Sequence, residues 1–304
     1  MNYPSVVVYV CSFYLVFGFE EWFLVWFGLE LNMISFLMLS HSLNNILVVE
    51  GMAKYFFIQS LASGLLVGMM YLGWNSFVWV TILVLKMGLG PFFGWYIKVV
   101  KSFTWGVNYI LMVFQSIMLL MLVLEVCSLF LFYMGMISMV VGVFGVFGQV
   151  NLKALLGYSS VFHGGWMFML MEEKGSLWWI YFFFYGLMML SIINLVVKQM
   201  FMGIYVSIGC SKNSFILMML NLGGIPPFTG FIMSWLTFYY LWGFDYGLLV
   251  LMVLMSLALL YAYFRFIYDI IMGGLFYVSW SIFSMVYFLG ESLSLVGLFV
   301  IFMF

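Results

Sequence analysis

The sequence reads VLKMGLGPFF over residues 84–93 and NLGGIPPFTG over residues 221–230, and each stretch lies within an apolar run long enough to cross a bilayer. Proline lacks the N–H that continues a helix, so Pro91 and the pair Pro226 and Pro227 each predict a helix break. Irregular backbone at membrane depth persists only where protein or a water-filled cavity satisfies its N–H and C=O groups. A matched pair of broken segments therefore predicts a transport site, although two proline kinks packed against neighbouring helices would give the same pattern.

The composition places the chain in a membrane. Apolar residues make up 67% of its 304 residues and charged residues only 6%, whereas about a quarter of the residues of a soluble domain are charged. The polar–apolar alternation of a transmembrane barrel is not found in the sequence. The net charge of −1 gives no indication of a nucleic-acid or acidic partner. We therefore predict an all-α polytopic membrane protein with one helical bundle over residues 1–304.

Polar residues divide the chain into about eleven predicted transmembrane spans. No connecting segment is long enough to form a separate domain. The two interrupted spans, 76–99 and 213–241, are separated by five positions in the order of spans, which suggests two five-helix units of related architecture. The predicted spans are 5–24, 25–47, 53–73, 76–99, 104–126, 128–149, 152–171, 176–200, 213–241, 246–272 and 280–303.

The residue usage indicates an organellar gene. The chain has 36 Phe, 28 Met and 12 Trp, and these residues share T- and G-rich codons with Val and Gly. The N-terminal Met1-Asn2-Tyr3-Pro4 leads directly into an apolar stretch without an Arg- and Ser-rich transit peptide. Both features predict synthesis inside the organelle, and a bacterial inner-membrane protein is the alternative.

Charged residues inside predicted spans are the first candidates for function, because a charge at the centre of a membrane helix costs about 2.5–3.5 kcal/mol on insertion scales. Lys86 lies one turn before the first predicted break, and Glu30 has no charged neighbour in sequence. We predict that the two approach each other directly or through water. Protonation of the glutamate would then let the lysine release its own proton, which makes the pair a switch. A buried ion pair that only fixes the order of the helices is the alternative.

Two further groups of polar residues are candidates for a proton path. Glu50 and Lys54 are four residues apart and would share one face of a helix, where a salt bridge at the membrane interface is the simpler interpretation. Lys153 and His163 flank a patch with several hydroxyl groups. Histidine exchanges protons near neutral pH, but a lone histidine is more often a hydrogen-bonded core residue.

Redox chemistry is not predicted for this chain. Cys11, Cys127 and Cys210 are widely scattered and lack metal-ligand spacing. His41 and His163 are too few for a pair of bis-histidine haems, though not for one haem, and the sequence contains no CxxCH, GxGxxG or Walker motif. We therefore expect no metal site and no cofactor in this chain, and we expect it to move ions and not electrons.

Five segments together resemble the NADH dehydrogenase subunit 2 family, the antiporter-like membrane subunits of mitochondrial respiratory complex I. The resemblance covers nearly the whole chain, in order and with similar spacings. The segments are Gly28–Met33, Glu50–Gln59 with Lys54-Tyr55-Phe56, Leu85–Gly88 with Pro91, Phe92 and Trp95, Gly157–Ser160 with His163, Gly165 and Trp166, and Leu222–Phe231.

The resemblance implies an antiporter-like inverted-repeat bundle that lacks the first three helices of the bacterial form. It also implies that Glu30 and Lys86 are the family's glutamate–lysine pair and that Lys54 is a further member of a proton relay. The chain would be a subunit of a proton-translocating NADH:ubiquinone reductase of the mitochondrial inner membrane. Its partners would be other membrane-arm subunits and lipids in a hetero-oligomer. NADH, FMN, iron–sulfur clusters and ubiquinone would bind elsewhere in the complex.

Two departures from the family pattern affect the expected relay. Ser116 follows Gln115 where the family usually has lysine, and Ser234 stands before Trp235 where the family again has lysine. We expect either water to bridge from Lys86 toward Lys153 and His163, with the serines as hydrogen-bonding stations, or Lys198 to supply a missing cation. The alternative functions are a structural complex I subunit with a lost or modified proton path and a stand-alone cation/proton antiporter.

Overall fold

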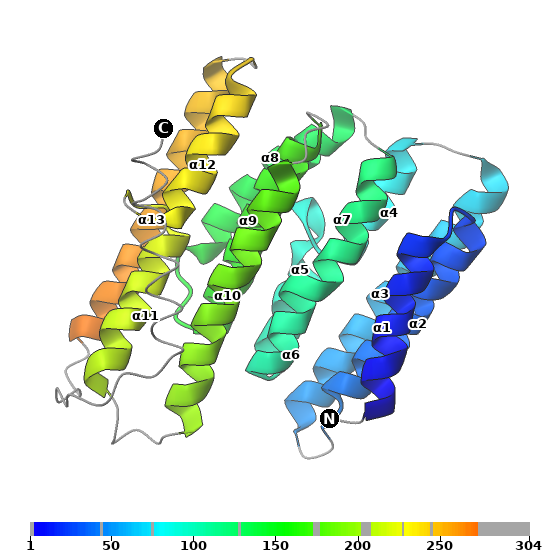
Figure 1. Cartoon of the computed structure of the whole chain (residues 1–304), viewed down its shortest axis with the longest axis horizontal. Coiled ribbons are helices and arrows are strands. Elements are labelled where there is room, and N and C mark those ends of the chain that lie inside the picture. Colours follow the sequence, from blue (N-terminus) through cyan, green and yellow to red (C-terminus); the bar gives the residue numbers. More distant parts are fainter. Residues whose placement is uncertain are drawn as a thin grey trace. The chain divides into compact units, whose positions relative to one another are not determined.

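The computed structural model of the chain describes residues 3–42, 45–73, 76–126, 129–172, 177–201, 208–226, 228–243 and 246–272. Within these ranges the regular structure is helical and contains no strand, in agreement with the predicted all-α class (Figure 1). The chain forms two compact units. The first holds residues up to 142 together with 151–172, and the second holds 143–150 and the described residues from 177 onward.

The first unit contains the first predicted break, with α3 packed against both halves of the broken segment, α4 and α5. In this unit α1 packs on α2 and α2 on α3 (Figure 1). The half-helix α4 also packs on α7, and α5 packs on α9. Its elements are α1 (Tyr3–Gly18), α2 (Trp22–Ser40), α3 (Ile46–Leu72), α4 (Ser76–Met87), the 3₁₀ turn η1 (Gly90–Phe92), α5 (Phe93–Ser102), α6 (Trp105–Tyr109), the π-helix η2 (Ile110–Phe114), α7 (Gln115–Glu125), most of α8 (Leu129–Val146) and α9 (Leu152–Glu172).

The second unit contains the second predicted break, between α11 and α12. Helix α11 packs on α10, α12 and α13. The described elements of this unit are α10 (Leu177–Phe201), α11 (Ile208–Leu222), α12 (Thr229–Tyr240), the 3₁₀ turn η3 (Leu241–Gly243) and α13 (Tyr246–Met272). Pro227 and the predicted span 280–303 lie outside the described residues. The relation of the two units by an inverted repeat stays a prediction.

Every predicted span up to residue 272 corresponds to a helix or to the two halves of a broken helix. Six of these segments are long and apolar enough, among the described residues, to cross a membrane: Trp22–Ser40, Ile46–Leu72, Ser76–Ser102, Trp105–Glu125, Leu177–Val197 and Tyr246–Tyr268. Helix α3 begins at Ile46 and so extends on the N-terminal side of the predicted span 53–73. This extension carries Glu50, which pairs with Lys54 on the helix surface.

The surface of the described chain carries large apolar side chains, as expected for a protein surrounded by lipid and other membrane subunits. Phe23, Phe57 and Phe183 are each more than 60% exposed. Polar residues such as Asn32, Gln59 and Lys86 are instead buried between the helices. This is the reverse of a soluble surface, and it directs the search for function to the interior.

Close packing of α3 on α5 depends on Gly51. A Cβ atom at this position would lie 1.8 Å from the Ser102 Oγ and 2.7 Å from the Ser102 Cβ. Small residues of this kind allow membrane helices to approach closely. Gly64, on the same helix, has no atom within 4 Å of its corresponding Cβ position.

We expect Gly51→Ala to destabilise the chain by about 1–3 kcal/mol, the usual cost of overpacking, and to lower its steady-state amount in the membrane. Gly64→Ala is the matched control and should leave that amount unchanged. The double variant Gly51→Ala with Ser102→Gly should recover most of the loss, because it removes the atoms in conflict. Equal losses for both single variants would show that the α3–α5 contact is not the cause.

Candidate functional site at the first helix break

The first break follows from a glycine pair and a proline. Helix α4 ends at Met87, and Gly88 and Gly90 adopt φ values of 70° and 56°. This left-handed region favours glycine. A Cβ at Gly88 would also lie 2.5 Å from the Cβ of Tyr96. Pro91 lies in the 3₁₀ turn η1 that follows, so the structure has the break that the sequence predicts.

Side chains from two helices satisfy carbonyl groups at the end of α4. The Trp95 indole Nε1 donates to the carbonyl of Leu85 at 3.1 Å. The Gln59 amide Nε2 donates to the carbonyl of Lys86 at 2.9 Å. The last carbonyls of a helix lack partners within the helix, and in a membrane no bulk water replaces them. Gln59 on α3 therefore holds the end of the half-helix that carries Lys86.

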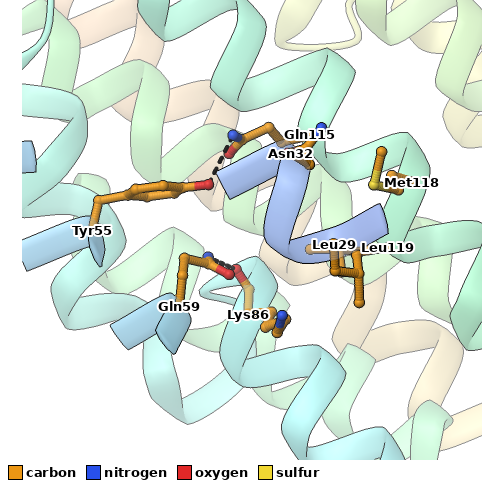
Figure 2. A pocket seen from close by; sticks show the side chains of 8 residues that line it. All are labelled: Leu29, Asn32, Tyr55, Gln59, Lys86, Gln115, Met118 and Leu119. Carbon is orange, nitrogen blue, oxygen red and sulfur yellow. Dashed lines mark hydrogen bonds between the residues drawn. The ribbon is translucent and has the colours of Figure 1, made fainter. Parts of the chain in front are cut away.

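A small cavity lies beside this helix end. It has a volume of ≈ 20 Å³, and about 10–15 Å³ of such volume holds one water molecule where polar partners are present. Figure 2 shows the Tyr55 hydroxyl and the Gln115 amide turned toward each other, with the Gln59 amide at the Lys86 backbone. Gln115 Nε2 donates to the Tyr55 hydroxyl at 2.9 Å. The cavity is lined by Leu29, Asn32, Tyr55, Gln59, Lys86, Gln115, Met118 and Leu119.

Lys86 is the charged residue of this cavity. Its side chain is only 4% exposed. Within the described residues the one ion pair closer than 4.0 Å joins Glu50 and Lys54, so Glu30 makes no direct salt bridge to Lys86. Glu30 is half-buried on α2. The arrangement leaves a buried cation beside polar groups and near a carboxylate that it does not touch.

Lys54 faces away from the cavity. Its ammonium pairs with the Glu50 carboxylate one turn earlier on α3, and both side chains are exposed in this chain. Tyr55 and Gln59 share the same four-residue spacing on the buried side of the helix. The structure therefore places Tyr55 and Gln59, and not Lys54, beside Lys86.

A second polar cluster joins α5 to α9. The Tyr96 hydroxyl and the Ser160 hydroxyl are 2.8 Å apart, and both residues are buried. Lys153 donates to the Phe103 carbonyl, just past the end of α5, at 2.6 Å and lies 5.5 Å from the centre of the Trp105 ring. A cation near the C-terminal end of a helix also interacts favourably with the helix dipole. Lys153 therefore makes a structural contact at the C-terminal end of α5.

Neither His163 nor Ser116 is among the residues that line the cavity. His163 is buried in α9 with its ring 5.5 Å from that of Phe162. The Ser116 hydroxyl donates to the carbonyls of Met112 and Val113, and the Ser234 hydroxyl donates to that of Phe231. Lys198 lies in α10, and its side chain is outside the described part of the chain.

At the second break a side-chain acceptor pairs with the backbone, whereas at the first break side-chain donors do so. The Asn221 Oδ1 accepts hydrogen bonds from the Thr229 hydroxyl at 2.8 Å and from the Gly230 N–H at 2.9 Å. Gly224 adopts a φ of 72° between them. The amide oxygen thus accepts from the Gly230 N–H in the first turn of α12, where N–H groups have no partner within the helix. It also links the end of α11 to the start of α12.

Comparisons with known proteins agree with this geometry. The family described as "NADH:quinone oxidoreductase/Mrp antiporter, TM" matches residues 72–260, more than half of the chain. NADH-ubiquinone oxidoreductase chain 2 of Locusta migratoria is 31% identical over 273 residues, which cover 83% of this chain and 80% of that protein. The corresponding protein of Anopheles gambiae is 29% identical over 285 residues, with 86% and 84% covered. The chain belongs to the NADH-ubiquinone oxidoreductase chain 2 family. The resemblance inferred from the sequence is thereby confirmed.

Solved structures share the fold of this chain 2 family member. A chain of the respiratory complex I from Thermus thermophilus matches with a TM-score of 0.79 at 20% identity, over 98% of this chain and 78% of that chain. A chain of the Mrp complex from Dietzia sp. DQ12-45-1b matches with a TM-score of 0.73 at 14% identity, over 86% and 59%. At these identities the matches establish the antiporter-like fold alone.

Sequence reasoning on this chain 2 sequence passed over Gln115, Tyr55, Gln59 and Asn32 as site residues. The residues predicted from the sequence were their neighbours Lys54, Glu30 and Ser116. The available signal was the four-residue spacing of Tyr55 and Gln59, which puts two polar groups on one face of an apolar helix. Among the described residues no group of three or more His, Cys, Asp or Glu side chains is placed to hold a metal ion.

We expect Asn221→Leu to destabilise the second break more than Thr229→Val does. Asn221→Leu removes the acceptor of two hydrogen bonds and leaves the half-buried Gly230 N–H without it, at a cost of about 1–3 kcal/mol. Thr229→Val removes one bond and leaves the Asn221–Gly230 bond in place, so about 1 kcal/mol is expected. Thermal denaturation of the membrane-embedded chain measures the order. Equal midpoints for the two variants would contradict the proposed role of the Gly230 contact.

Proposed function

We propose that the chain is a membrane-arm subunit of NADH:ubiquinone oxidoreductase that contributes to proton translocation coupled to electron transfer. The observation that carries this proposal is the buried Lys86, at the end of a half-helix and beside a polar cavity large enough for water. A fixed cation next to water at membrane depth is a group that can accept and release a proton. Family membership supports the assignment to this enzyme complex.

The proposed chemistry is proton transfer without electron transfer in this chain. Lys86 holds a proton, and water in the adjoining cavity accepts it when the nearby carboxylate of Glu30 is neutralised. Because Glu30 makes no direct salt bridge to Lys86, the carboxylate can change its charge without breaking a direct contact. NADH, FMN, iron–sulfur clusters and ubiquinone would bind to other subunits.

The finer features of the proposal follow from the family. We place the chain in the mitochondrial inner membrane as a multi-pass subunit made inside the organelle, in a hetero-oligomer with other membrane-arm subunits and lipids. The family pattern also supports an inverted repeat that lacks three helices of the bacterial form. Lys54 pairs with Glu50 on an exposed face, so we propose that it acts at the surface of this chain and not in the cavity.

A structural role without conduction is the second candidate. One observation favours it: Ser116 and Ser234, which replace expected lysines, both donate to carbonyls of their own helices. Neither serine carries a charge, so neither stores a proton as an ammonium group does. A stand-alone antiporter is separated from both by native gels, on which the chain should migrate with NADH dehydrogenase activity.

We expect Lys86→Met and Glu30→Gln each to lower the number of protons translocated per NADH oxidised, because each removes one titratable member of the proposed pair. The complex should still assemble, since within the described residues neither side chain makes a salt bridge closer than 4.0 Å. The measurement is proton uptake by sealed membrane vesicles during NADH oxidation, with assembly checked on native gels.

Lys98→Met is the matched control, because Lys98 is an exposed lysine on α5. It should leave the proton-to-NADH ratio unchanged. If Lys86→Met also leaves the ratio unchanged in assembled complex, the structural role is correct and the proposed function is wrong.

A further inference from the structure

Gln115 occupies a special position in its helix. The π-helix η2 ends immediately before it, and the Gln115 N–H donates to the carbonyl of Ile110, five residues earlier. A single π turn inserted in a membrane helix changes which face the following residues present, and such turns are frequent at functional sites. Gln115, Met118 and Leu119 at the start of α7 line the cavity beside Lys86.

The side chain of Gln115 reaches across this cavity to another helix. Its Nε2 donates to the hydroxyl of Tyr55 on α3 at 2.9 Å. Tyr55 is 2% exposed. The hydroxyl oxygen accepts this bond, so its own O–H proton is available to a second acceptor. The two residues therefore form a hydrogen-bonded polar pair that lines the same cavity as Lys86 (Figure 2).

Ser116 is turned differently. Its hydroxyl donates to the carbonyls of Met112 and Val113 on its own helix, at 2.9 Å and 2.8 Å. Short hydroxyl side chains commonly bond in this way to the preceding turn. Ser116 is not one of the eight residues that line the cavity. The residue that replaces the family's lysine thus makes its contacts away from Lys86.

We infer that Gln115 and Tyr55, and not Ser116, form the first hydrogen-bonded step beyond Lys86 on the proton path of this chain. This inference rests on the proposed function. A proton leaves the Lys86 ammonium for a water in the cavity, which leaves a neutral amine and a hydronium. The Tyr55 hydroxyl accepts a hydrogen bond from that water and positions it to take the proton, while the tyrosine itself stays neutral. Gln115 is a positioning residue: its amide holds the tyrosine oxygen and does not itself change charge.

The test compares three substitutions in the assembled complex. Gln115→Met keeps a side chain of similar length without the amide, and Tyr55→Phe removes only the hydroxyl. Loss of this step should slow proton translocation about fivefold at an equal rate of NADH oxidation, as expected for one net hydrogen bond lost from the transfer step. Ser116→Ala is the matched control on the neighbouring position and should change nothing. The double variant of Gln115 and Tyr55 should be no slower than the single variants, because both residues act through one contact.

The ratio of protons to NADH separates this role from a merely structural one, because a loss of complex lowers both rates together. Full coupling in Gln115→Met and Tyr55→Phe, or an equal loss in Ser116→Ala, would overturn the inference. Lys86→Met distinguishes a failure of the proposed function from a failure of the role inferred for Gln115 and Tyr55. If it uncouples while Gln115→Met and Tyr55→Phe do not, only this inference fails, and if it leaves coupling intact, the proposed function fails first.

Discussion

The requirement that every backbone polar group at a membrane helix break find a partner determines the structure around Lys86. The carbonyls of Leu85 and Lys86 receive the Trp95 indole and the Gln59 amide. These donors belong to α5 and α3, so side chains of both elements reach the end of α4. The packing that satisfies the backbone also brings Tyr55, four residues before Gln59, to the cavity. The polar site thus results from the need to pair the backbone carbonyls at the end of α4 in an apolar medium.

The two breaks pair their backbone groups with opposite kinds of side-chain group. At the first, side-chain donors satisfy the carbonyl end of a half-helix. At the second, the Asn221 Oδ1 accepts from the Gly230 N–H at the start of the next half-helix. A backbone N–H only donates, so this contact also fixes which atom of the Asn221 amide is the oxygen. Asn221 therefore has a backbone role that a residue without an acceptor could not fill.

Local sequence features predicted the breaks, because glycine and proline act through their own backbone at Gly88, Gly90 and Pro91. The helical spans up to residue 272 were predictable for the same reason, since length and apolar content are local. The relation of Glu30 to Lys86 was not, because it depends on how α2 and α4 pack. Helix α3 also extends beyond the predicted span 53–73 to Ile46, through the part that carries Glu50 of the Glu50–Lys54 pair. The π-helix before Gln115 could not be predicted, because a hydrophobic pattern with the ideal α-helical period does not reveal a single π turn.

The length of a polar side chain decides whether it serves its own helix or a neighbouring one. Ser116 has one bond between Cβ and its oxygen, so the carbonyls of the preceding turn are within reach and hold its hydroxyl. Gln115 has two more carbons and reaches the Tyr55 hydroxyl on α3. Serine at position 116 therefore keeps its polar group within its own helix and out of the space between helices. The neighbouring long side chain then becomes the polar group of that helix at the Lys86 cavity, and the π turn that precedes it aims it there.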